Sequence, residues 1–335
     1  MTEAPTAIRQ LPKPHPFVGV PHEVWSHQQL ALLRKVEPVA IQRPFELNGS
    51  PLRLPSPIVE LEDDRLELKG IRLLLKRDDL IHPELPGNKW RKLKFNLEEA
   101  LAQGHEQLLT FGGAYSNHLR ATAAAGRHFG LNTVGVVRGE EHLPLNESLS
   151  YAAKMGMRLV YLDRTTYRRK TDPAVLDRLI DQLGPSYVLP EGGSNGLAAR
   201  GCTELVEEIA EDFDTICCAS GTGCTLAGIA ACLRPGQHAI GFSVLKGGDF
   251  LEDEVRRFQR EAFAIETDTW SVDTSFHFGG YARRTPELDS FIADFEQRHS
   301  MVLDWIYEAK MMYGIFARIA SGHFTAGSTV VSVLS

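Results

Sequence analysis

The sequence predicts an α/β protein in which parallel sheets are flanked by helices and arranged in two domains. Between residues 107 and 183, apolar segments of strand length alternate with longer segments of helical periodicity. A second series of the same kind begins near Tyr187 and runs to the last residues of the sequence. Alternation at this spacing is typical of βαβ units. Two such series indicate two domains, and the cleft between domains is a usual place for a small-molecule site.

The individual elements follow from local patterns. Asn48-Gly49 and Lys69-Gly70 are turn signals in a region of short strands. A helical segment that begins at Asn88 is expected to end at Gly104. The expected helices cover residues 28–36, 88–104, 116–130, 146–155, 173–183, 196–212, 221–233 (with a Gly-rich turn), 249–263 and 311–322. The expected strands cover residues 71–76, 107–111, 132–139, 158–163, 214–220, 238–245 and 328–335, and residues 187–195 are expected to form a strand and a loop.

Composition limits the class of protein. The formal net charge of −7 argues against a broad nucleic-acid-binding surface. No apolar run reaches the roughly 20 residues of a membrane span, and the N-terminal segment lacks the apolar core of a signal peptide. We therefore expect a cytoplasmic protein with no membrane and no nucleic-acid partner. The five cysteines lack a metal-like spacing and are expected to be buried thiols: Cys202, Cys217, Cys218, Cys224 and Cys232.

The Gly-rich turn at residues 220–225, Ser-Gly-Thr-Gly-Cys-Thr, joins a strand to a helix. Glycines let the backbone approach an anion, and a helix N-terminus offers free N–H groups. Thr222 and Thr225 add hydroxyl donors. The turn is neither a Walker loop nor a complete dinucleotide-binding fingerprint. It predicts a phosphate site, with a tight strand–helix turn as the alternative interpretation.

Lys89 follows a Gly turn at the start of the helix expected from residue 88. A helix N-terminus lowers the pKa of an amine, which suits a lysine that forms a Schiff base. Lys92 and Lys94 lie close by, so position alone does not choose among the three. The alternative interpretation is a solvated lysine in a first helical turn.

A third segment, residues 111–120 (FGGAYSNHLR), also joins a strand to a helix start. Ser116 or Asn117 is a good N-cap, so helix capping is one interpretation. The other interpretation is a polar cluster, Ser116, Asn117 and His118, that points toward a ligand.

Taken together, the three segments resemble pyridoxal-phosphate enzymes of fold type II, whose two-domain architecture is that of the tryptophan synthase β subunit. More closely, the chain is similar to the 1-aminocyclopropane-1-carboxylate deaminase and D-cysteine desulfhydrase family. The similarity runs from about Leu75 to the last residue and includes KRDDL, GNKWRKLKFNLEEAL, FGGAYSNHLRATAAA, SGTGCTLAGI, FGGYA and IYEAKMMYGI. It implies a large cofactor-binding domain from residues 1–91 and 191–335, with a small α/β domain inserted at residues 92–190.

The resemblance assigns roles to individual residues. Lys89 forms the Schiff base with pyridoxal 5'-phosphate and later moves the substrate's α-proton. Asn117 bonds the phenolic oxygen of the cofactor. Ser116 faces the substrate carboxylate or the reacting carbon. The residues implied to hold the phosphate are Gly221, Thr222, Gly223, Cys224 and Thr225. Relatives commonly have Gly at the position of Cys224, a change that leaves the backbone N–H in place.

The remaining motifs point to two substrates. His118 is the desulfhydrase-like residue, whereas the deaminase has glutamine there. Tyr281 and Tyr307 match two catalytic tyrosines beside the deaminase substrate. Glu308, in Tyr-Glu-Ala-Lys, follows the deaminase pattern, and a carboxylate beside the pyridine nitrogen would keep it protonated. Ser335 stands where relatives have His-Thr or His-Leu before a Gly-Gly pair, and it is the other candidate contact for that nitrogen.

The resulting prediction is a pyridoxal-phosphate-dependent lyase or deaminase of amino-acid metabolism. The first candidate reaction is β-elimination from D-cysteine, which gives a 2-oxo acid, ammonia and sulfide. The alternatives are ring opening of 1-aminocyclopropane-1-carboxylate, reaction of another small amino acid, and a catalytically silent cofactor-binding homologue. A nucleotide-binding enzyme is weaker, because the strand after the Gly-rich turn ends in Leu245-Lys246 and not in an acidic residue. By resemblance, we expect a homodimer.

Overall fold

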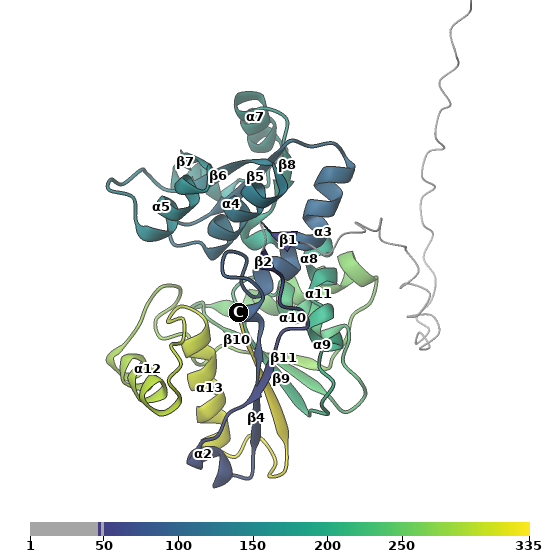
Figure 1. Ribbon diagram of the computed structural model, residues 1–335, viewed down its shortest axis with the longest axis vertical. Coiled ribbons are helices and arrows are strands. Elements are labelled where there is room, and N and C mark those ends of the chain that lie inside the picture. The colour runs from purple at the N-terminus through teal and green to yellow at the C-terminus, as the bar shows by residue number, and fades with distance from the viewer. Residues whose placement is uncertain (1–45, 48–49) are drawn as a thin grey trace, which may run out of the picture. The chain divides into compact units, whose positions relative to one another are not determined.

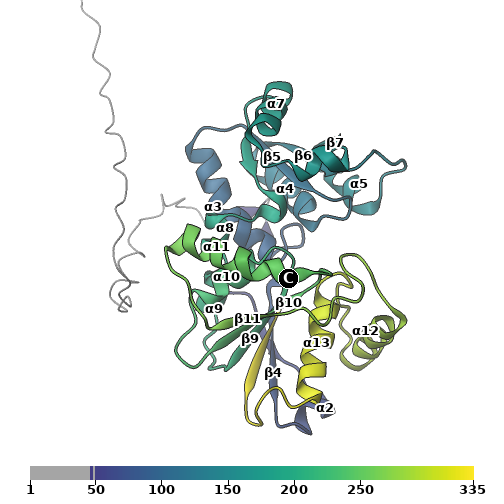
Figure 2. The same ribbon diagram turned by 180° about the vertical axis from the view of Figure 1, so that it is seen from behind.

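The computed structural model describes residues 46–47 and 50–335. The described residues belong to one compact unit that contains two larger, separate sheets with helices around them (Figure 1, Figure 2). This arrangement confirms the predicted α/β fold class. The helix expected at residues 28–36 and the turn at Asn48-Gly49 lie outside the described residues.

The larger sheet has six strands in the order β11-β10-β9-β12-β4-β3. All neighbouring pairs are parallel except β3 and β4. Its strands come from both ends of the described chain. They are β3 (Ile58–Glu60), β4 (Arg72–Arg77), β9 (Thr215–Ser220), β10 (His238–Ser243), β11 (Trp270–Asp273) and β12 (Thr329–Leu334).

The smaller sheet has four parallel strands in the order β7-β6-β5-β8. Every one of its strands falls between residues 107 and 189, inside the range expected for the inserted domain. They are β5 (Gln107–Gly112), β6 (Asn132–Arg138), β7 (Arg158–Leu162) and β8 (Tyr187–Leu189). A short antiparallel pair, β1 (Glu46–Leu47) and β2 (Ser50–Pro51), precedes both sheets in the chain.

The helices cover the sheets and supply the site. The helix α3 packs against α4 and α8, and α8 packs against α10 and α11. Among the described residues, no helix is long and apolar enough to cross a membrane. The bounds are α2 (Asp64–Glu67), α3 (Asn88–Ala102), α4 (Asn117–Phe129), α5 (Glu147–Lys154), α6 (Arg164–Arg168), α7 (Pro173–Leu183), α8 (Gly196–Gly201), α9 (Glu204–Glu207), α10 (Cys224–Ala230), α11 (Leu251–Phe263), α12 (Pro286–His299) and α13 (Glu308–Ala320), with 3-10 turns η1 (Asp78–Leu80), η2 (Glu191–Gly193) and η3 (Gly248–Phe250).

The long helix expected over residues 196–212 is wrong, because the chain forms two short helices there, α8 and α9. The hydroxyl of Thr203 donates to the carbonyl of Arg200, a local bond that competes with helical pairing. Just before the break, a Cβ on Gly201 would lie 2.0 Å from the carbonyl oxygen of Arg91. The close approach of α8 to α3 is therefore preferred over a continuous helix.

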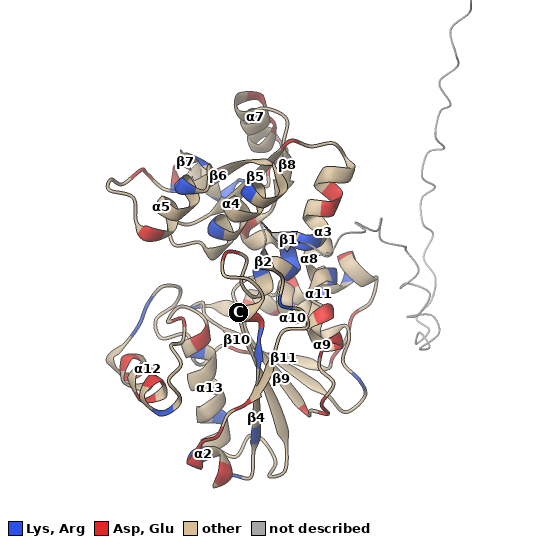
Figure 3. Ribbon diagram, viewed as in Figure 1, with Lys and Arg blue, Asp and Glu red and all other residues tan. Residues whose placement is uncertain are grey.

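Four charged side chains, three of them fully buried, hold the start of α3 in place. Both oxygens of Asp78 accept from the guanidinium of Arg91, at 2.6 and 2.8 Å. Glu208 accepts from Arg91 at 2.8 and 3.0 Å and from the Lys76 amine at 2.6 Å. The side chains of Lys76, Asp78 and Arg91 are fully buried. In Figure 3, basic and acidic positions meet where β4 ends. Two cations and two carboxylates balance one another, so no charge in this network is left without a partner.

Removing one member of the network should be strongly destabilising. Asp78→Asn leaves Arg91 with one carboxylate in a dry environment, and we expect the free energy of unfolding to fall by about 3–5 kcal/mol. Asp79→Asn is the matched control, because the Asp79–Arg77 pair is partly exposed and such pairs contribute about 0–1 kcal/mol. Urea unfolding of both variants measures the difference. Equal losses for the two variants would contradict a special role for Asp78.

Candidate functional site

A cavity of about 740 Å³ lies where strands of both sheets end. The segments that line it follow the carboxyl ends of β5, β6, β8, β9 and β12, the usual position of ligand sites in open α/β sheets. Eleven of the thirteen predicted site residues line this cavity: Lys89, Ser116, Asn117, His118, Gly221, Thr222, Gly223, Thr225, Tyr281, Tyr307 and Ser335. The side chains of Cys224 and Glu308 do not line it.

Lys89 lies in the first turn of α3, immediately after a constrained glycine. Gly87 has a φ of 59°, and a Cβ there would lie 2.4 Å from the Cα of Ser335. Glycine is therefore required both by the backbone conformation and by the neighbouring strand. The turn at Gly87 starts α3 at this point and leads Lys89 into the cavity.

The amine of Lys89 has no hydrogen-bond or ion-pair partner within residues 50–335. Its side chain keeps some exposed surface because it borders the cavity, yet protein surrounds the amine. This burial, together with the charge of Lys92, lowers the pKa of Lys89 to about 7. A large fraction of the amine is therefore unprotonated near neutral pH, the form that acts as a nucleophile.

Lys92 is the functional residue that the sequence did not single out from its neighbours. It is 3% exposed, and its amine lies near neutral oxygens only: Ser194 Oγ at 3.2 Å, Thr222 Oγ1 at 3.4 Å and the Gly192 carbonyl at 3.5 Å. In the described part of the chain, no carboxylate forms an ion pair with it. A buried cation without a counterion, beside a Gly-rich turn, indicates that an anion binds here. The second glycine pair, Gly192-Gly193, was the available signal in the sequence.

The Gly-rich turn closes the other side of this anion site. Gly223, with a φ of 79°, is the N-cap of α10, so backbone N–H groups are free at this point. The hydroxyls of Thr222 and Ser194 lie 2.7 Å apart. Thr225 accepts from the Asn88 side chain at 3.2 Å, which joins the turn to the start of α3. Cys224 directs its buried thiol toward the carbonyl of Asn195, so only its backbone N–H is available to a ligand.

The start of α4 contributes three neighbouring polar residues. Ser116 is the N-cap and accepts from the Leu119 N–H at 3.3 Å, so the capping interpretation and the site interpretation both apply to it. Asn117 lines the cavity. His118 is buried and lies 2.7 Å from Thr110 Oγ1 through its Nε2. Burial, then Lys89 and Lys92, hold the pKa of His118 well below its usual value, so the ring is neutral.

Two polar atoms in the cavity wall are buried without a partner among the described residues. They are Nδ1 of His118 and Oγ of Ser220. Buried polar groups of this kind are rare in folded proteins, and both belong to residues that border the cavity.

Tyr281 and Tyr307 form a pair on the wall of the cavity. Their ring centres are 5.9 Å apart in an edge-to-face arrangement. Burial raises the pKa of both phenols, so both keep their protons at neutral pH. Lys310 holds the loop that carries Tyr281, since its buried amine donates to the carbonyls of His277 and Gly280 at 2.9 and 2.7 Å.

Glu308 and Ser335, the two candidate contacts for the pyridine nitrogen, are joined by a hydrogen bond. Oε1 of Glu308 accepts from the Ser335 N–H at 2.7 Å, and Oε2 accepts from the Asp304 N–H at 3.1 Å. Ser335 lines the cavity and Glu308 lies behind it. Burial raises the pKa of Glu308 to about 7. In this arrangement Glu308 positions Ser335, and Ser335 is the residue that faces a ligand.

Comparisons with known proteins show the family to which the chain belongs. Residues 50–335 match the family described as "Pyridoxal-phosphate dependent enzyme". The chain is 32% identical to a putative 1-aminocyclopropane-1-carboxylate deaminase of Thermotoga maritima, over 78% of this chain and 88% of the relative. It is also 32% identical to the mitochondrial bifunctional D-cysteine desulfhydrase/1-aminocyclopropane-1-carboxylate deaminase of Arabidopsis thaliana, over 79% of this chain and 72% of the relative. A crystal structure of an ACC deaminase homologue superposes with a TM-score of 0.76 at 26% identity, covering 92% of this chain and 94% of that one.

The lowered pKa of Lys89 can be measured without any ligand. An unprotonated amine reacts with acylating reagents, so labelling of Lys89 should reach half its maximal rate near pH 7. Lys92→Gln removes the neighbouring charge and should raise this midpoint by about one pH unit. Mass spectrometry of peptides labelled between pH 5 and 10 gives both profiles. A midpoint near pH 10 in the unmodified protein would contradict the proposed environment of Lys89.

Proposed function

Because the chain belongs to the family of pyridoxal-phosphate dependent enzymes, we propose that it eliminates sulfide and ammonia from D-cysteine. The observation that carries the proposal is the pairing of two lysines in one cavity. Lys89 presents an amine whose pKa is lowered to about 7, and Lys92 presents a buried cation beside the Gly-rich turn. A nucleophilic amine next to an anion site matches a cofactor that carries both an aldehyde and a phosphate.

The residues of the cavity fit this cofactor. Lys92 and the backbone N–H groups of residues 221–225 would hold the phosphate, with the hydroxyls of Thr222 and Thr225 as further donors. Lys89 would hold the aldehyde carbon. Asn117 would donate to the phenolic oxygen. Ser335, positioned by Glu308, would face the pyridine nitrogen.

The proposed reaction is balanced by one water: D-cysteine and water give pyruvate, ammonia and hydrogen sulfide. The bound cofactor supplies a conjugated ring that takes up the electron pair left on the substrate's α-carbon. Lys89 would be the base that removes the α-proton of the bound substrate. Its lowered pKa suits this role, since an efficient base has a pKa close to the working pH.

Three further residues would act on the substrate. Ser116 and the first N–H groups of α4 would bind the carboxylate, because a helix N-terminus favours an anion. Tyr281 and Tyr307 keep their protons at neutral pH. One of the two phenols can therefore donate a proton to the departing sulfur and recover it from the partner hydroxyl or from water.

Ring opening of 1-aminocyclopropane-1-carboxylate is the second candidate. Two observations favour it: Glu308 follows the deaminase pattern, and the Arabidopsis relative bears both activities in its name. In this reaction one water is also consumed, and the products are 2-oxobutanoate and ammonia. The same tyrosine pair would lie beside the cyclopropane ring.

The proposal extends to the organisation of the protein. We propose a cytoplasmic homodimer, and the large domain of residues 1–91 and 191–335 with residues 92–190 inserted. The sheet composition supports the domain division, since the four strands of the smaller sheet fall within the inserted range. Size-exclusion chromatography with light scattering tests the dimer.

Replacement of Lys89 tests the function. The purified protein incubated with pyridoxal phosphate should show a visible cofactor band that D-cysteine changes, and it should release sulfide and pyruvate. Lys89→Ala should lose the band and reduce turnover at least about 100-fold, since it removes the general base. Lys94→Gln is the matched control on the same helix, because Lys94 pairs with Glu204 and is absent from the cavity wall.

The products separate the remaining alternatives. Release of 2-oxobutanoate from the cyclopropane substrate without sulfide from D-cysteine would replace the first candidate by the second. A panel of small D- and L-amino acids extends the test to other substrates. A cofactor band that no amino acid changes would contradict both reactions and indicate a catalytically silent homologue.

A further inference from the structure

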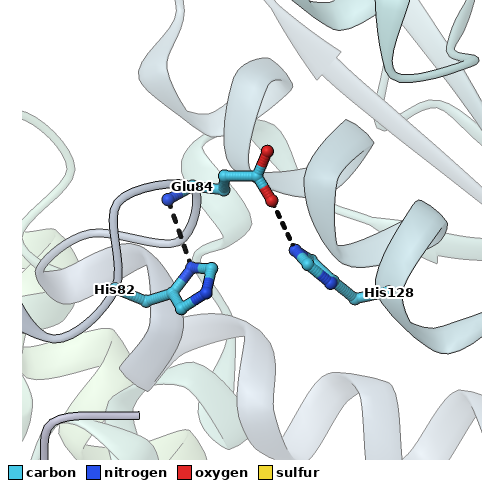
Figure 4. Close-up of side chains that lie close together, drawn as sticks. All are labelled: His82, Glu84 and His128. Carbon is cyan, nitrogen blue, oxygen red and sulfur yellow. Dashed lines mark hydrogen bonds and ion pairs between the residues drawn. The ribbon is translucent and has the colours of Figure 1, made fainter. Parts of the chain in front are cut away.

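A second group of polar side chains lies beside the cavity, around the carboxylate of Glu84. His82 and Glu84 belong to the loop between η1 and α3, and His128 lies in the last turn of α4 (Figure 4). One nitrogen of each imidazole and one carboxylate oxygen lie within 4.8 Å of one another. The two rings stand edge to face, with centres 5.4 Å apart. Three side chains from two separate segments therefore converge on one point.

The hydrogen bonds of this group leave several atoms without partners. His128 Nε2 lies 2.6 Å from Glu84 Oε2, and His82 Nδ1 accepts from the backbone N–H of Glu84 at 3.2 Å. The other nitrogens, His82 Nε2 and His128 Nδ1, have no partner among the described residues. His82 is 3% exposed and the side chain of His128 is 2% exposed. Neither orphan nitrogen is therefore open to bulk water.

Tyr151 adds a third polar group to the surroundings of Glu84. Its buried hydroxyl lies within hydrogen-bonding reach of the Glu84 carboxylate. Burial, then the Glu84 carboxylate, raises the pKa of Tyr151 to about 12. The two orphan nitrogens lie on the far sides of the rings from Glu84 (Figure 4). The observation that favours a bound ion is therefore the convergence of the other two ring nitrogens with one carboxylate oxygen.

We propose that His82, Glu84 and His128 bind a divalent transition-metal ion, with Zn²⁺ as the best match to the ligands. Two imidazoles and one carboxylate form a ligand set that suits zinc and neighbouring first-row metals. Tetrahedral coordination at about 2.0–2.2 Å places any two ligand atoms roughly 3.3–3.6 Å apart. The ligand atoms here lie within 4.8 Å of one another, so side-chain shifts of up to roughly 1.5 Å would bring them to this spacing.

Metal binding would displace one weak hydrogen bond and would turn a second hydrogen bond into shared coordination of the ion. The bond from the Glu84 N–H to His82 Nδ1 is long at 3.2 Å, and a neutral bond of this kind contributes about 1 kcal/mol. The His128–Glu84 contact converts from a hydrogen bond to shared coordination when Nε2 gives its lone pair to the ion. Three protein ligands leave at least one position for water.

A metal at this point would connect two parts of the main cavity. The loop of residues 81–87 leads directly to Lys89, and Glu84 itself lines the cavity. The helix α4 carries Ser116 and Asn117 at its other end. The ion would therefore fix the loop before Lys89 against α4 and act as a positioning element at the rim of the site. This inference rests on the cluster alone and is independent of the substrate.

Metal titration of the full chain tests the proposal. After treatment with a chelator, the protein should bind one Zn²⁺ per chain at this site by calorimetry. Co²⁺ should give the visible absorbance of a low-symmetry site without a thiolate charge-transfer band. His128→Asn and Glu84→Gln should each weaken binding at least about tenfold, as loss of a direct ligand does. His238→Asn is the matched control, because His238 bonds Ser271 on the larger sheet.

Urea unfolding curves of the variants show whether each one folds. Glu84→Gln keeps the shape of the side chain, so a folded Glu84→Gln variant with weakened binding supports the site even if His128→Asn is unstable. Absence of saturable binding to the unmodified protein would overturn the proposal. Binding that survives in both variants would also overturn it, because the ion would then be held by other histidines or cysteines.

Discussion

The guanidinium of Arg91, held between Asp78 and Glu208, is the interaction on which the site depends. Arg91 lies in the first turn of α3, and Asp78 follows directly after β4. The carbonyl of Asp78 also accepts from the N–H of Gly87 at 2.9 Å, so the loop between them is closed at both ends. A buried charge network fixes direction as well as distance, because each donor must meet its acceptor in a dry environment. The first turn of α3, and with it Lys89, therefore has one orientation.

Three basic residues at the start of α3 meet two kinds of environment. Lys89 and Lys92 are three residues apart, so they lie on the same face of the helix and point into the cavity. Arg91 lies on another face and meets two carboxylates. The structure thus neutralises the charge that holds the helix and leaves the two charges that face the cavity without a counterion. Helical geometry places Lys89 and Lys92 on the cavity face, and the two nearby carboxylates pair with Arg91 instead. The cavity therefore offers one amine that can bind an anion and one that can be neutral.

Most of the fold and much of the site could be predicted from local sequence patterns. The strand and helix alternation predicted both sheets, and three strand–helix junctions contained eight of the predicted residues that meet in the cavity. Tyr281, Tyr307 and Ser335 were implied only by the resemblance to the deaminase and desulfhydrase family. The break between α8 and α9 could not be predicted, because it depends on the packing of Gly201 against Arg91, 110 positions earlier in the chain. The role of Lys92 was hidden for the same reason: its lack of a counterion is a property of the surroundings, and no local pattern reports it. The relation of Glu308 to Ser335 likewise exists only in three dimensions.

The unpaired charge of Lys92 links the protonation of Lys89 to the binding of an anion. In the free site, its charge adds to burial in lowering the pKa of Lys89. An anion on the Gly-rich turn offsets the charge of Lys92 and thereby weakens this effect, so the affinity of Lys89 for a proton rises. The amine is then a good nucleophile while the site is being filled and a stronger base after it is filled. Reciprocity of linked equilibria requires that protonation of Lys89 also strengthens anion binding. Two lysines one helical turn apart are sufficient for this coupling, and no conformational change is needed.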